Sequence, residues 1–158
     1  MWQTAAALEI YFISGMEIMM SQLKCDFKVV GPVQTNCYFL SNTDTRECVI
    51  VDPGEEAGKI ADFIEKKELK PIAILLTHGH FDHIGAVDEI RNRYGIKVYA
   101  AAAEKETLEN PDINLSSQFG GGYTVKADEF LNDGQEIELL GEKVRCLLTP
   151  GHTKGGMC

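Results

Sequence analysis

The chain alternates short β-like runs of apolar residues with longer runs whose apolar positions follow helical spacing. The first strands are predicted at residues 27–30, 37–40 and 48–51. Asp52-Pro53-Gly54 ends the third run, as turn residues do. Residues 55–69 place Ala57, Ile60 and Ile64 on one face, and Pro71 closes this segment. We therefore predict a three-stranded meander followed by an amphipathic helix.

Residues 72–76 are an uninterrupted apolar run of strand length, which indicates a strand buried on both faces. Helical spacing returns at Ile84, Val87 and Ile90. The remaining predicted elements are a strand at 96–100, a short helix at 101–108 and a hairpin of 136–140 with 144–148. Residues 110–126 lack periodicity and predict a long, mobile loop. This alternation of strand and helix predicts the α/β class.

Length and composition narrow the possibilities to one domain without a nucleic-acid partner. At 158 residues and 44% hydrophobic, the chain is long enough for one core and short for two. Its 24 acidic against 15 basic residues, a net charge of -9, provide no basic surface for a phosphate backbone. Five cysteines without a C-x-x-C pair favour neither a disulfide framework nor a thiolate zinc site. A reducing, cytoplasmic location is the expectation.

The first residues lack the features of a targeting segment. They carry Glu9 and Glu17 and no basic n-region, which argues against a signal peptide. Their uncharged stretches are far shorter than the roughly 20 residues of a membrane span. We therefore expect residues 1–22 to be an unstructured extension and residues 23–158 to form the domain, without membrane association.

Three of the four histidines fall within the segment 78–83. In an extended segment His78 and His80 point the same way and can bind one ion, and Gly79 permits the tight path between them. Asp82 and His83 follow directly and can face a second ion, while His152 would complete a three-histidine site with one position open for water. Imidazole and carboxylate ligands suit zinc, iron or manganese. The pattern predicts a metal-dependent hydrolase.

Several of these residues have simpler interpretations. Asp82 is also suited to be the N-cap of the helix that begins near Ile84, and it can do this while binding metal. Asp52 either forms a turn through its side chain or orients a ligand histidine. The region of Tyr123 and Lys126 belongs either to a substrate contact or to a surface loop. Cys158 has no base near it in sequence, so it is not expected to be a nucleophile.

The histidine segment resembles the signature of a known family. Thr-His-Gly-His-Phe-Asp-His-Ile-Gly, residues 77–85, matches the H-x-H-x-D-H motif of the metallo-β-lactamase superfamily. Val51-Asp52-Pro53-Gly54 and Thr149-Pro150-Gly151-His152-Thr153 are similar to two further motifs of that family, in the same order. The resemblance runs from about residue 25 to the end and implies an αββα sandwich. The last two motifs look like those of the glyoxalase II branch, the hydroxyacylglutathione hydrolases.

The resemblance implies roles for the site residues. His78, His80 and His152 would hold a first metal ion, Asp82 and His83 a second, and Asp52 would support them. Asp82 is also the candidate catalytic residue. Members of that branch use two zinc ions, sometimes iron or manganese, to activate a water that attacks a small-molecule thioester. No side-chain nucleophile is required, because a metal ion lowers the pKa of its water.

The chain also departs from the family pattern. No Asp or His follows His152, so the bridging Asp and the final His of the family are missing. We therefore expect a C-terminally truncated form that lacks the last part of the second half of the sandwich, with weak second-metal binding and low activity. The alternatives are an iron-dependent persulfide dioxygenase of the same fold and an inactive metal-binding fragment. The acidic composition argues against the RNA-processing relatives.

Overall fold

The computed structural model describes residues 22–119 and 121–158, so the prediction for residues 1–22 lies, apart from Gln22, outside the described residues. The strands are β1 (Leu23–Val30), β2 (Thr35–Asn42), β3 (Glu47–Val51), β4 (Lys70–Leu75), β5 (Lys97–Ala101), β6 (Glu129–Leu131), β7 (Glu136–Leu139) and β8 (Glu142–Arg145). The helices are α1 (Ala57–Lys66), α2 (Phe81–Ile84), α3 (Val87–Tyr94), the 3-10 turn η1 (Ala102–Glu104), α4 (Lys105–Glu109) and α5 (Ser116–Phe119).

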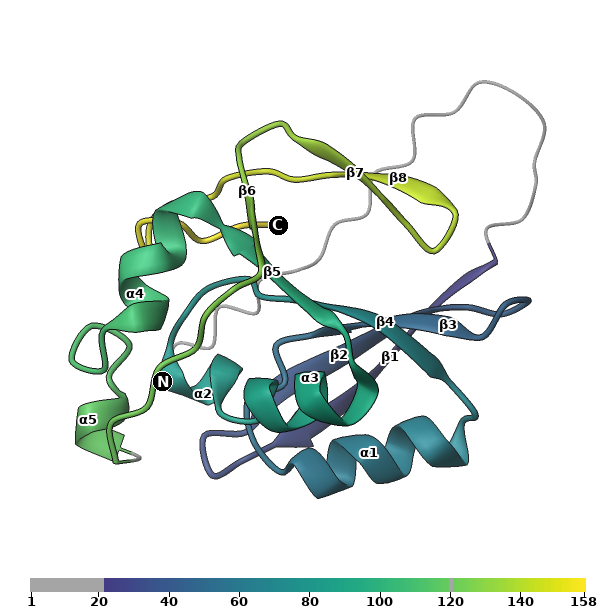
Figure 1. The fold of residues 1–158 in the computed structure, drawn as a ribbon, viewed down its shortest axis with the longest axis horizontal. Helices are drawn as coiled ribbons and strands as arrows, with labels where there is room; N and C mark the ends of the chain where they lie inside the picture. The colour runs from purple at the N-terminus through teal and green to yellow at the C-terminus, as the bar shows by residue number, and fades with distance from the viewer. Residues whose placement is uncertain (1–21, 120) are drawn as a thin grey trace.

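Six strands form one mixed sheet in the order β1-β2-β3-β4-β5-β6 (Figure 1). The first three are antiparallel, which confirms the predicted meander. The pairs β3–β4, β4–β5 and β5–β6 are parallel, so helices connect them. Strands β7 and β8 form the predicted hairpin apart from this sheet. The α/β prediction is confirmed.

The two faces of the sheet are covered by different elements. In β2 the side chains of Thr35, Cys37, Phe39 and Ser41 are buried in strict alternation with their neighbours. Cys37 and Phe39 belong to the core beneath α1 and α3, where Ile60 of α1 also lies. The members of the opposite core are Val49, Val51, Ala73 and Leu140, the last from the β7–β8 hairpin. A helix layer, a sheet and a hairpin on the sheet's other face (Figure 1) agree with the expected fold.

The sequence predicted that Pro71 closes the helix, and this prediction is wrong. Helix α1 ends at Lys66 with Lys67 as its C-cap, and Pro71 lies inside β4 opposite Cys48. The register of the β3–β4 pair shifts between Cys48 and Val49. Proline has no N–H to donate to a ladder, and it is tolerated in a central strand where the ladder is irregular.

The segment 110–126, predicted to be a long loop, contains the short helix α5 (Ser116–Phe119), and buried polar groups hold its described residues in place. Asn114 and Ser116 are fully buried. The Asn114 side-chain amide and the Ser116 hydroxyl both donate to the Tyr123 carbonyl at 2.9 Å. The Tyr123 hydroxyl donates to the Phe81 carbonyl at 2.8 Å, which ties the segment to the first turn of α2. The sequence pattern that predicted a mobile loop gave no indication of these hydrogen bonds.

All five cysteines are free thiols, in agreement with the expectation of no disulfide framework, and Cys37, Cys48 and Cys146 are buried. Within residues 22–119 and 121–158, no helix is both long and apolar enough to cross a membrane.

Candidate metal centre

The parallel strands β3, β4 and β5 end at one edge of the sheet, and the residues after each strand lie near each other there. Asp52 directly follows β3, and its backbone adopts the left-handed region with φ 52°. The Thr77 N–H donates to Asp52 Oδ1 at 2.8 Å, and the Thr77 hydroxyl donates to Asp52 Oδ2 at 2.5 Å. The buried Asp52 carboxylate therefore fixes the start of the histidine segment.

His78 and His80 come from the segment between β4 and α2. His80 is the N-cap of α2 and has extended backbone (φ -68°, ψ 151°), and the two ring centroids are 4.9 Å apart. His78 is buried, and its Nδ1 lies 3.1 Å from the Thr77 hydroxyl. Its Nε2 is buried and has no hydrogen-bond partner among the described residues. An unsatisfied buried nitrogen is costly unless something binds it.

His152 reaches the same place from the far end of the chain. Leu148 and Met157 form a β-bridge on either side of the loop that carries His152, and the Met157 N–H donates to the Thr77 carbonyl at 2.9 Å. This docking places His152 Nε2 3.0 Å from His80 Nδ1. One ligand nitrogen from each of His78, His80 and His152 lies within 4.8 Å of the other two.

The three nitrogens fit a metal ion. The unpartnered Nε2 of His78 and the facing nitrogens of His80 and His152 can direct three lone pairs at one ion. Three imidazoles suit zinc and also iron or manganese, and three protein ligands leave a position for water. The predicted first-metal ligands are thus brought together by the fold.

Asp82 and His83 lie beside this group without joining it. Asp82 Oδ2 accepts a hydrogen bond from the Thr35 hydroxyl at 2.8 Å and lies 3.4 Å from His83 Nε2. The two residues are neighbours, as a shared ion requires, and among the described residues the close ligand group contains neither of them. Asp82 is not an N-cap, because His80 caps α2 and Ala86 caps α3. That interpretation of Asp82 is wrong.

The second interpretation of Asp52 agrees with its contacts. Asp52 Oδ2 lies 2.9 Å from His83 Nδ1, so the carboxylate orients the ring and leaves Nε2 directed toward Asp82. Burial disfavours the charged form of His83, but the hydrogen bond that its ring donates to Asp52 and the charges of Asp52 and Asp82 outweigh burial and raise its pKa.

The pKa values of two ligand histidines shift in the opposite direction, downward. Burial, with the neighbouring His83, lowers the pKa of His78 to about 3. Burial and the proximity of His152 lower the pKa of His80. Both rings are therefore neutral at pH 7, which is the form that binds a metal ion.

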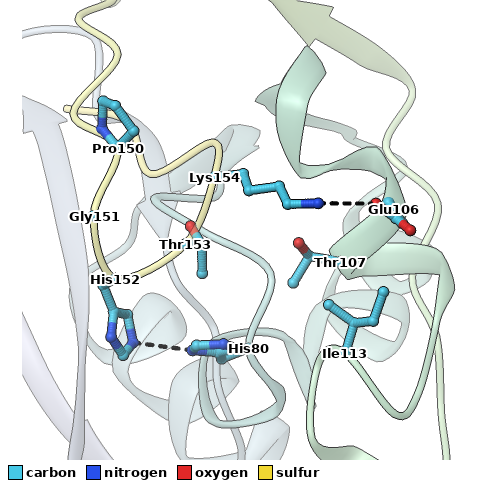
Figure 2. A pocket seen from close by; sticks show the side chains of 9 residues that line it. All are labelled: His80, Glu106, Thr107, Ile113, Pro150, Gly151, His152, Thr153 and Lys154. Carbon is cyan, nitrogen blue, oxygen red and sulfur yellow. Dashed lines mark hydrogen bonds and ion pairs between the residues drawn. The ribbon is translucent and has the colours of Figure 1, made fainter.

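An open cavity of about 440 Å³ adjoins His80 and His152 (Figure 2). Its other lining residues are Glu106, Thr107, Ile113, Pro150, Gly151, Thr153 and Lys154. Lys154 and Glu106, which come from two different lining segments, form an ion pair at 3.6 Å (Figure 2). Tyr123 and Lys126 are not among the lining residues, so the described cavity gives no support to a substrate contact there.

Sequence reasoning missed three residues that hold the site. Thr35 fixes Asp82, Thr77 is held by Asp52, and Glu104 accepts hydrogen bonds from the backbone of both segments that carry the ligand histidines. Thr77 stood inside the quoted motif, but its role depends on the proximity of β3. Glu104 lay in a predicted short helix, where an acidic residue ordinarily faces solvent. Its burial results from contacts between distant segments, which no local pattern indicates.

The chain is similar to known proteins over most of its length. Residues 30–158 match the sequence profile of the metallo-beta-lactamase superfamily. A probable metallo-hydrolase, YqgX of Bacillus subtilis, is 44% identical over 130 residues, which cover 81% of this chain and 61% of YqgX. A probable polyketide biosynthesis zinc-dependent hydrolase of the same species, PksB, is 34% identical over 136 residues, covering 82% of this chain and 55% of PksB. The chain therefore spans about three-fifths of the length of these relatives.

Solved structures share the fold. The B3 metallo-beta-lactamase BLEG-1 superposes with a TM-score of 0.78 at 40% identity, over 85% of this chain and 65% of that one. TTHA1623 in a di-iron-bound form superposes with a TM-score of 0.68 at 29% identity, over 84% of this chain and 64% of that one. A probable zinc-dependent hydrolase and a di-iron-bound protein are thus both similar to this chain.

Proposed function

This chain belongs to the metallo-β-lactamase superfamily, and from that premise we propose that the protein is a metal-dependent hydrolase of small-molecule thioesters. One observation carries the proposal: ligand nitrogens of His78, His80 and His152 converge within 4.8 Å beside an open cavity. Because the chain spans about three-fifths of its relatives, the activity proposed is that of the whole protein.

In this proposal His78, His80 and His152 hold one metal ion, and Asp82 with His83 contribute to a second. A divalent ion bound there supplies Lewis-acid activation of water and of the scissile carbonyl. Zinc is the first expectation, with iron or manganese as alternatives.

The chain's own residues contribute orientation and proton acceptance. Asp52 fixes the His83 ring, and the Thr35 hydroxyl fixes the Asp82 carboxylate. The free lone pairs of Asp82 can accept the proton that an attacking water releases. The side chains of Thr107 and Ile113 give the cavity both polar and apolar contacts for an acyl group.

A thioester suits these residues because a thiol, with a pKa near 8.5, departs as a thiolate without a proton donor. An amide nitrogen requires protonation before it leaves. Among the lining residues described, the titratable groups are the two candidate ligands His80 and His152 and the pair Glu106–Lys154. The motif forms around Asp52 and His152 also resemble the thioester-cleaving branch.

A second candidate substrate is a β-lactam. The observation in its favour is the likeness to BLEG-1, at 40% identity and a TM-score of 0.78. The reaction class is the same, hydrolysis at a carbonyl, and only the leaving group differs.

The test compares the two substrate classes on this chain, with the relative YqgX assayed alongside. The metal-reconstituted 158-residue chain and full-length YqgX are assayed with acyl-glutathione and acyl-coenzyme A thioesters and with a chromogenic cephalosporin. We expect thioester turnover that a chelator abolishes and that His80→Ala lowers on the order of 100-fold or more. Lys59→Ala, on the solvent-facing side of α1, is the surface control. Preferential lactam cleavage would replace the first candidate with the second.

Metal content and oxygen uptake are measured on the same samples. One bound iron with oxygen consumption and no hydrolysis would support the dioxygenase alternative instead.

A further inference from the structure

A carboxylate that the ligand set does not use is buried next to the metal centre. Glu104 is the last residue of η1, after β5, and its exposed fraction is 0%. Its Oε2 accepts a hydrogen bond from the Gly79 N–H at 2.8 Å, and its Oε1 accepts one from the Gly155 N–H at 2.7 Å. Both oxygens are thus bound by backbone groups from segments far apart in the sequence.

These two glycines belong to the two segments that carry the histidines. Gly79 stands between His78 and His80, and Gly155 lies three residues after His152. One rigid carboxylate therefore spans the chelating tripeptide and the loop of the third ligand. We propose that Glu104 is a positioning residue that sets the separation of these two segments, so that His78, His80 and His152 share one ion. The inference rests on the metal site of the proposed function.

The glycines make this close approach possible. A Cβ atom on Gly155 would lie 2.7 Å from the Ala103 carbonyl carbon and from the Glu104 nitrogen. A Cβ atom on Gly79 would lie 3.1 Å from the Leu108 side chain. Any larger residue at Gly155 would push the His152 loop away from η1.

Burial of Glu104 is costly in free energy unless its charge is compensated. The ion pairs of the described residues include none with Glu104, so two backbone N–H groups are its partners. Because these two N–H groups come from different loops, both hydrogen bonds to Glu104 form in only one arrangement of the loops, and they stabilise that arrangement. The same docking is supported by the Met157 N–H to Thr77 carbonyl bond at 2.9 Å.

The test is metal affinity, measured by zinc competition with a chromogenic chelator and by the absorption spectrum of the cobalt-substituted chain. In Glu104→Gln one acceptor becomes an N–H donor that faces a backbone N–H. We expect the zinc Kd to rise about 10- to 100-fold, and the cobalt spectrum to shift toward fewer nitrogen ligands. Glu104→Asp keeps the charge but is one methylene too short to span both glycines, so it does not rescue the affinity.

Asp128→Asn is the matched control. Asp128 also bridges two segments, accepting from the Val98 N–H at 2.8 Å and from Arg91 at 2.7 Å, but it touches neither histidine segment. The zinc Kd of the Asp128→Asn variant should stay within about twofold of wild type, even if its free energy of unfolding decreases. An equal loss of affinity in this variant would show that general destabilisation explains the effect, and would overturn the proposal.

A double-mutant cycle separates positioning from unfolding. If Glu104 acts by placing His152, then Glu104→Gln adds less than about threefold to the Kd of His152→Ala. Fully multiplicative losses, or a Glu104→Gln Kd within twofold of wild type, would overturn the proposal.

Hydrogen exchange on the wild-type chain tests the inference even if these variants do not fold. We expect zinc to slow the Gly79 and Gly155 amides together, because they share one acceptor residue. Protection of Gly79 alone would contradict it. None of these measurements uses a substrate. They therefore test the role of Glu104 even if the protein does not hydrolyse thioesters.

Discussion

His80 Nδ1 faces His152 Nε2 at 3.0 Å, although 72 residues separate the two in the sequence. A hydrogen bond between these atoms satisfies one lone pair at most, and a shared ion satisfies both. The distance between these two nitrogens therefore reports whether the His152 loop has docked on the segment that carries His80.

Zinc should stabilise the folded chain through this pair. At a free zinc concentration 100 times the Kd, linkage predicts a gain of about 2.7 kcal/mol in the free energy of unfolding. Urea unfolding with and without zinc measures it. His80→Ala should lose the gain, and Lys154→Ala, an exposed neighbour paired with Glu106, should keep it. A gain retained in His80→Ala would mean that zinc binds elsewhere.

Asp52→Asn should destabilise the metal-free fold. The buried carboxylate accepts two hydrogen bonds from Thr77 and orients His83, and an amide would turn donors toward donors. Hydrogen bonds to charged groups contribute about 1.5–3 kcal/mol each, so a loss of about 3 kcal/mol is expected from urea unfolding. The control is Asp44→Asn in an exposed turn, with a change below about 0.5 kcal/mol. Equal effects would show that Asp52 is not holding this segment.

Gly54→Ala and Gly58→Ala should have opposite effects. A Cβ atom on Gly54 would overlap the Asp82 carbonyl oxygen, at 1.8 Å, and would displace α2 with Asp82 and His83. A Cβ atom on Gly58 in α1 meets nothing within 4 Å. We expect Gly54→Ala to lower stability by more than about 3 kcal/mol, and Gly58→Ala to raise it by about 0.5–1 kcal/mol. Thermal unfolding of both variants checks the pair.

Tyr123→Phe should cost about 1 kcal/mol at neutral pH, through the lost hydrogen bond to Phe81. Burial, with the charge of Glu55 next, raises the pKa of Tyr123 to about 12 from its ordinary value of 10. A raised folded-state pKa gives stability that is complete below pH 10 and is lost as the pH rises toward 12. The difference between wild type and variant should therefore shrink above pH 10 in unfolding curves. A constant difference from pH 8 to 11 would contradict the assignment.

The sequence predicted the elements whose apolar pattern is local. The meander, helix α1 and the histidine segment were located because their spacing alone shows which side chains share a face. Strand β6 was missed, since Glu129–Leu131 has only three residues and exists by pairing with Tyr99–Ala101 of β5. Pro71 misled for a related reason, because its effect depends on the irregular ladder next to Cys48.

The candidate site divides in the same way. The ligand histidines are adjacent in sequence or belong to a motif, so their proximity was predictable. Thr35 and Glu104 become visible only after folding, since each holds a partner from a different element. A residue that positions a ligand is recognised by its contacts in the folded structure, and the spacing of residues in the sequence does not show these contacts.

The docking of the His152 loop on Thr77 also orders events during synthesis of the chain. The ribosome releases His78 and His80 long before His152, about 4 to 14 seconds earlier at about 5–20 residues per second. Through that interval a nascent chain presents two imidazoles and lacks the third. An ion captured then would have two protein ligands and would exchange freely, and it would become tightly held only when the His152 loop docks on Thr77.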